Sequence, residues 1–88
     1  MTHDELTHDQ IRAIALEALT KVAPDLAGEP IPDDADLRDA YDLDSMDFLN
    51  WLTALHRRLG VDIPELDYPK LSNLGAATEY LAARLQGS

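Results

Sequence analysis

A serine lies among aspartates in the stretch LDSMDFLNWL, residues 43–52, where an apolar segment begins. Asp44 is a favoured residue for capping a helix, and Asp47 places a second carboxylate near the positive end of the helix dipole. The simplest interpretation is that Asp44 caps a helix and that Ser45 is an ordinary residue of its first turn. A second interpretation is that the exposed hydroxyl of Ser45 is a point of chemical attachment.

Other kinds of chemistry have little support in the sequence. The chain has no cysteine, which excludes disulfides, thiolate metal sites and cysteine nucleophiles. Its acidic stretches do not continue with the glycine and the distal glutamate that a calcium loop needs, so we expect no metal site. The three histidines are far apart and do not form a catalytic order with serine and aspartate, so we expect no enzyme; they are His3, His8 and His56.

Length and charge limit the remaining possibilities. With 88 residues the chain forms one domain, 1–88, with one modest core. The net charge of −10 argues against nucleic acid and anionic membranes as partners. No apolar run is long enough to span a membrane, and the acidic N-terminus does not resemble a signal peptide. We expect a cytoplasmic protein, without membrane insertion, that is a monomer.

Apolar spacing predicts an all-α fold. Residues 1–6 are expected to be a loose N-terminal segment, followed by a helix that Thr7 caps and Pro24 ends. The long acidic loop 24–44 is expected to be ordered by its apolar residues, with one helical turn near 35–40. A second helix runs from Ser45 to Leu59, a short helix covers residues 64–70, and the last helix begins at Ser72. The sequence thus predicts a small four-helix bundle of three longer helices and one short helix.

The second helix is the most apolar element. Its expected stripe consists of Met46, Leu49, Leu52, Leu55 and Leu59, widened by Phe48 and Trp51. Gly60 then ends the helix.

At this point the chain resembles the acyl carrier proteins. The resemblance covers roughly residues 7–85 and rests on the triplet Asp44-Ser45-Met46 with Asp47 after it, on the order of the helices, on the long acidic loop, and on the segment GVDIPE after the second helix. It implies that Ser45 accepts a 4′-phosphopantetheine group from coenzyme A. A phosphodiester is favoured at a helix N-terminus by its free N–H groups and dipole.

The resemblance also implies partners and a cargo. A phosphopantetheinyl transferase would modify Ser45, with Asp44 binding it, and acyl-loading and acyl-transfer enzymes would act on a thioester at the end of the arm. Met46 replaces the family's leucine and is expected to fill the same site because the two side chains have similar volumes. The space that commonly shelters the acyl chain would be lined here by Leu49, Ala54, Leu59 and Ile63.

Two departures from the family pattern bear on the pathway. General fatty-acid carriers present acids along the second helix, whereas this chain has Asn50, Thr53, His56, Arg57 and Arg58 there. A specialised pathway is therefore expected. The glycine-rich lead-in of peptidyl carriers is missing before Ser45, which favours the acyl type. An aminoacyl or peptidyl variant, and an unmodified acidic adaptor that binds a basic protein surface, remain as alternatives.

Overall fold

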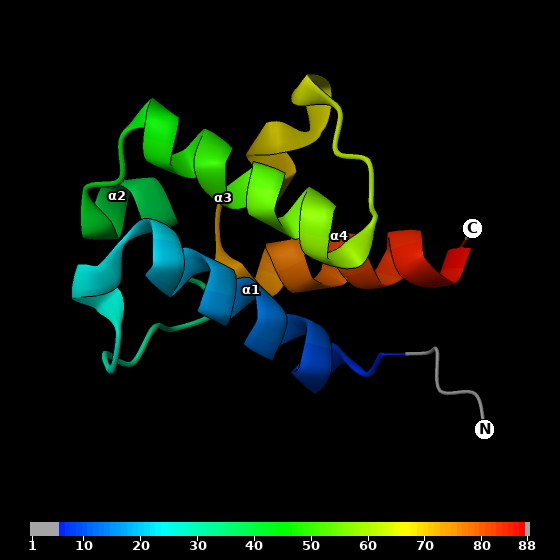
Figure 1. Cartoon of the computed structure of the whole chain (residues 1–88), viewed down its shortest axis with the longest axis horizontal. Coiled ribbons are helices and arrows are strands. Elements are labelled where there is room, and N and C mark those ends of the chain that lie inside the picture. Colours follow the sequence, from blue (N-terminus) through cyan, green and yellow to red (C-terminus); the bar gives the residue numbers. More distant parts are fainter. Residues whose placement is uncertain (1–5, 88) are drawn as a thin grey trace.

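The computed structural model describes residues 6–87, and these residues are helical without a β-strand. The long helices are α1 (His8–Val22), α3 (Ser45–Leu59) and α4 (Leu74–Gly87). Between them lie η1 (Pro24–Leu26), α2 (Leu37–Tyr41) and η2 (Glu65–Leu71). In Figure 1, α1 runs in the opposite direction to α3 and α4, so that α2 and the start of α3 lie together at one end. The predicted all-α class is confirmed.

The ends of the long helices follow the expected chemistry in most places. Thr7 and Gln10 form a reciprocal capping box at α1, and the Asp44 side chain accepts a hydrogen bond from the Asp47 N–H at α3. Gly60 ends α3 with φ 70°, a left-handed conformation that glycine adopts without steric cost. The predicted boundaries of the second helix are confirmed.

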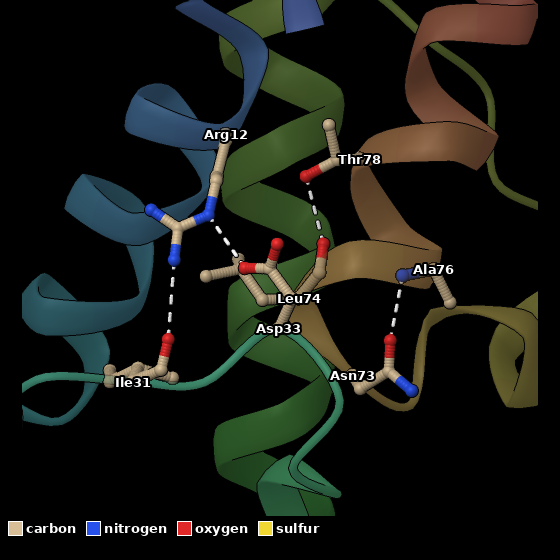
Figure 2. Close-up of polar contacts among 7 residues, drawn as sticks. All are labelled: Arg12, Ile31, Asp33, Asn73, Leu74, Ala76 and Thr78. Atoms are coloured by element: carbon tan, nitrogen blue, oxygen red, sulfur yellow. Dashed lines mark hydrogen bonds and ion pairs between the residues drawn. The ribbon is translucent and has the colours of Figure 1, made fainter. Parts of the chain in front are cut away.

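The start of the last helix was predicted wrongly. Ser72 is not its cap, since α4 begins at Leu74 and the Asn73 side chain accepts the Ala76 N–H at 2.6 Å. Asn73 also forms an isolated bridge with Asp36, so its position is fixed partly by the distant loop. Figure 2 shows the Asn73–Ala76 contact beside the Thr78 hydroxyl, which donates to the Leu74 carbonyl.

The long loop is ordered, as predicted, because it is attached to the core at several points. It contains η1 and α2 rather than the single turn that was expected. Arg12 of α1 holds the middle of the loop through Asp33, at 2.7 Å, and through the Ile31 carbonyl, at 3.2 Å (Figure 2). The apolar residues of the loop are buried or pack against the core; they are Leu26, Ile31, Leu37, Tyr41 and Leu43.

One core brings the long helices together. Trp51 lies at its centre, fully buried, and its indole N–H donates to the Ala15 carbonyl of α1 at 2.9 Å. The face of α3 that is buried differs from the predicted stripe. Phe48, Trp51, Leu52 and Leu55 are buried, whereas Met46 and Leu49 are 64% and 41% exposed. The spacing of apolar residues is compatible with burial of either side of this broad apolar surface. The side that carries the large rings of Phe48 and Trp51 is the one that is buried.

The predicted loose segment 1–6 lies outside the described residues except for Leu6, which packs against the core. No helix within residues 6–87 is long and apolar enough to cross a membrane.

Candidate functional site

Ser45 is the first residue of α3, and its side chain is exposed. Asp44 precedes it in an extended conformation and caps the helix at 2.8 Å through the Asp47 N–H. The Phe48 N–H is taken by the Asp44 carbonyl. The first N–H groups of an α-helix have no acceptor within the helix, so those of Ser45 and Met46 point out of its end. The hydroxyl therefore lies where a helix favours an anion.

The long loop contributes a basic residue to this place. The Arg38 guanidinium of α2 donates to the Ser45 hydroxyl oxygen at 3.2 Å. It also lies over the Phe48 ring, with 5.6 Å between the guanidinium carbon and the ring centroid. Arg38 was not among the residues predicted for the site. A signal was present in the sequence, because Arg38 is the only lysine or arginine between Lys21 and Arg57.

An open groove of about 940 Å³ begins at Ser45. Phe48 forms part of its wall, and the Tyr68 ring of η2 meets the Phe48 ring edge-on at 6.4 Å. The groove thus lies between α2, the first turns of α3, and η2. Its lining combines apolar side chains with polar ones at the rim; the residues are Asp36, Arg38, Asp39, Leu43, Ser45, Phe48, Leu49, Glu65, Tyr68, Pro69 and Ser72.

The wall that η2 contributes is held by a polar cluster. Asp67 of η2 accepts from the Tyr80 hydroxyl at 2.6 Å and from Arg84 at 2.9 Å, both on α4, and Lys70 lies 3.4 Å away. The Tyr80 hydrogen bond, with smaller contributions from Lys70 and Arg84, lowers the pKa of Asp67. Burial raises the pKa of Tyr80, and its hydrogen bond to Asp67 adds to that effect. The cluster fixes η2 on α4 and so fixes one side of the groove.

The residues predicted to line an acyl space do not share one cavity. Leu49 lines the groove beside Ser45, whereas Ile63 lines a separate hollow of about 360 Å³ between α3 and the segment that precedes η2. Ala54 lines a third hollow of about 360 Å³ toward α1, and Leu59 packs partly buried against the core. Leu49, Ala54 and Leu59 lie on different sides of α3, and Ile63 lies beyond the end of that helix.

The other predicted site residues lie at the N-terminus of α3. Met46 is exposed, and Asp47 is half-buried in the first turn. Among residues 6–87, no group of three or more histidine, aspartate or glutamate side chains is arranged to hold a metal ion.

The far end of α3 is basic. Arg58 pairs with Glu17 of α1 at 2.8 Å, and this contact lowers the pKa of Glu17. Arg57 is exposed and lines the third hollow together with Lys21 and Arg58. The two ends of α3 therefore differ in charge: acids surround Ser45, and cations gather about three turns away.

Comparison with known families identifies the family of this chain. The protein-family model described as "Phosphopantetheine attachment site" matches residues 9–81. This range includes Ser45, nearly all of α1, the whole of α3 and most of α4. No curated protein and no solved structure matches the chain. The predicted resemblance to acyl carrier proteins is thereby confirmed, and the chain belongs to the phosphopantetheine-attachment family, whose domains carry a covalently bound 4′-phosphopantetheine.

Proposed function

We propose that this chain is an acyl carrier protein, a single carrier domain built as a four-helix bundle, in which Ser45 bears the 4′-phosphopantetheine arm. The observation that carries the proposal is the position of Ser45: exposed, first in α3, at the mouth of the groove and inside the segment that matches the family. When bound, the arm supplies the thiol that the cysteine-free chain lacks, and this thiol holds the acyl group as a thioester.

The residues around Ser45 suit such an arm. The N–H groups of the first turn favour the negative charge of a phosphodiester. The apolar wall of the groove, Phe48 with Leu43 and Leu49, offers cover to the less polar parts of the arm and its cargo. Acids on the loop and at Asp44 and Asp47 repel an anion but attract a transferase with a basic surface. We take this as the role of Asp44 beyond capping.

The experiment is the intact mass of the protein before and after incubation with coenzyme A and a broad-specificity phosphopantetheinyl transferase. Wild type gains one phosphopantetheinyl mass, and Ser45→Ala gains none. The unfolding free energy of the variant stays within about 0.5 kcal/mol of wild type, because Asp44 still caps the helix. Modification of Ser45→Ala would place the arm elsewhere. A wild type that is never modified would leave the acidic adaptor as the better hypothesis.

The charge pattern of α3 supports a dedicated pathway. Enzymes that recognise acidic carriers do so with basic surfaces, and a like-charge contact can cost several kcal/mol. Arg57, which has no ion pair within residues 6–87, presents a cation on the exposed face of α3, where Asn50 and Thr53 are also exposed. We therefore propose that the modified protein serves its own acyl-loading and acyl-transfer enzymes and is a poor substrate for general fatty-acid elongation.

A side-by-side elongation assay with a general fatty-acid carrier of the same cell tests this second part. Arg57→Glu is the sharper variant, because Arg58→Glu would also break the ion pair with Glu17. Arg57→Gln removes the charge without reversing it and serves as the matched control. We expect Arg57→Glu to recover part of the deficit and Arg57→Gln less. Equal rates for wild type and the general carrier would contradict the specialisation but leave the carrier function intact.

A further inference from the structure

We propose that Arg38 is a binding residue for the phosphodiester that joins Ser45 to its arm. This inference rests on the proposed function, and it adds a role for a loop residue that the attachment motif does not contain. Its starting observation is the hydrogen bond from the guanidinium to the Ser45 hydroxyl oxygen, at 3.2 Å. That oxygen is the atom through which a phosphodiester would be bonded to the protein.

The position of Arg38 is fixed by the structure around it. Leu37, its neighbour, is fully buried, and the Leu37 N–H donates to the Ser72 carbonyl at 2.9 Å. Asp36 caps α2 and accepts the Arg38 N–H at 3.1 Å and the Asp39 N–H at 3.0 Å. The side chain then extends over the buried Phe48 ring. A guanidinium held in this way loses less conformational freedom when it binds an anion than a freely moving one would.

Within residues 6–87, Arg38 differs from most other cations of the chain. Arg12, Arg58, Lys70 and Arg84 are each within 4.0 Å of a carboxylate. Arg38 has no such ion pair there, although its segment is rich in aspartate, and it contacts the neutral Ser45 hydroxyl instead. A hydrogen bond to a neutral hydroxyl is weaker than one to an anion. The guanidinium is therefore available for a stronger acceptor at the same place.

The charges around Ser45 give a reason for the contact with Arg38. An anion on Ser45 is attached next to Asp44 and close to Asp47, both of which repel it. The N–H groups of the helix end offset part of this repulsion, and Arg38 supplies a full positive charge in direct contact with the Ser45 oxygen. The planar fork of N–H donors in a guanidinium matches the two non-bridging oxygens of a phosphodiester, so arginine suits this group better than lysine does. The arm would then leave the protein in a defined direction, along the groove whose rim Arg38 shares with Ser45.

The test compares phosphopantetheinylated wild type with Arg38→Ala, Arg38→Lys and the control Lys21→Ala, which removes one positive charge from the last turn of α1. Intact mass establishes loading. The buried Trp51 indole N–H resonance, whose hydrogen bond to Ala15 depends on the fold, verifies that each variant is folded. The readout is the ³¹P NMR shift of the phosphodiester, referenced to the same protein unfolded in urea.

We expect wild type and Lys21→Ala to share one ³¹P shift, displaced from the unfolded value. Arg38→Ala should move most of the way to the unfolded value, with Arg38→Lys between them. Attachment of the arm should raise the thermal midpoint less in Arg38→Ala than in wild type. A loaded, folded Arg38→Ala with the wild-type shift and the wild-type rise would overturn the role of Arg38 alone. Absence of loading on wild-type Ser45 would overturn the proposed function and this inference with it.

Discussion

Asp44 is expected to have two separable roles, as the cap of α3 and as a charge that the transferase reads. Asparagine caps helices about as well as aspartate does, so Asp44→Asn keeps the acceptor for the Asp47 N–H, now 2.8 Å from the carboxylate. Asp44→Ala removes both the acceptor and the charge. The pair of variants therefore distinguishes a structural defect from an electrostatic one.

The expected magnitudes follow from the geometry. Losing a capping side chain costs about 1 kcal/mol, which for a domain of this size lowers the thermal midpoint by about 4–8 °C in Asp44→Ala. Asp44→Asn loses only the favourable charge at the helix end, about 0.3–1 kcal/mol. In contrast, if the transferase forms a hydrogen bond to the Asp44 carboxylate, Asp44→Ala loses about 1.5–3 kcal/mol of binding and is modified roughly 10–100 times more slowly. Asp44→Asn keeps a neutral acceptor, so its rate should fall less but still measurably, by about the difference between a charged and a neutral hydrogen bond.

The assay is the initial rate of phosphopantetheine transfer at several salt concentrations, beside urea unfolding of the same variants. The wild-type rate should fall as salt rises, and the rates of both variants should depend on salt less steeply, because one exposed charge has been removed. An Asp44→Asn protein that is modified as fast as wild type would refute the electrostatic role. A slow Asp44→Ala together with a normal Asp44→Asn would show that capping alone matters.

The other predictions concern the supports of the site. Gly75→Ala places a Cβ 3.2 Å from both the Cβ and the carbonyl oxygen of Asp33, so overpacking should outweigh the gain in helix propensity by about 1 kcal/mol in urea unfolding; unchanged stability would mean that the loop moves aside freely. Tyr80→Phe removes the hydrogen bond that lowers the pKa of Asp67. A carboxyl group whose pKa is lower in the folded than in the unfolded state stabilises the fold at pH values above its unfolded-state pKa, and this stabilisation is lost as the pH falls through its folded-state pKa. Acid unfolding below about pH 4, followed by circular dichroism, should therefore begin at a higher pH in this variant than in wild type. An identical acid transition would contradict this prediction. Trp51→Phe loses a buried hydrogen bond and leaves a small cavity, which should cost about 2 kcal/mol by the same unfolding measurement; a cost near zero would mean that the core refills.

Local sequence determined the helical elements and the position of Ser45. The boundaries of α3 could be predicted because both of its ends are specified by nearby residues: Asp44 at the start and Gly60, at φ 70°, at the end. The cap of α1 follows in the same way from Thr7 and Gln10. These interactions span three or four residues, so a local pattern contains all the information that they need.

Tertiary structure alone decided which residues surround the serine. Arg38 precedes Ser45 by seven positions, and Tyr68 follows Ser45 by more than twenty positions. Both residues nevertheless line the same groove. Their meeting depends on Leu37 being buried, on the Asp33 and Asp36 contacts with the start of α4, and on Asp67 holding η2 against that helix. Likewise, the spacing of apolar residues predicts a broad apolar face on α3 but not which part of it is buried. Packing against α1 decided that Trp51 is buried and that Met46 is exposed. Contacts between distant segments are chosen by the competition of all side chains for one small core, and no local spacing records the outcome of that competition.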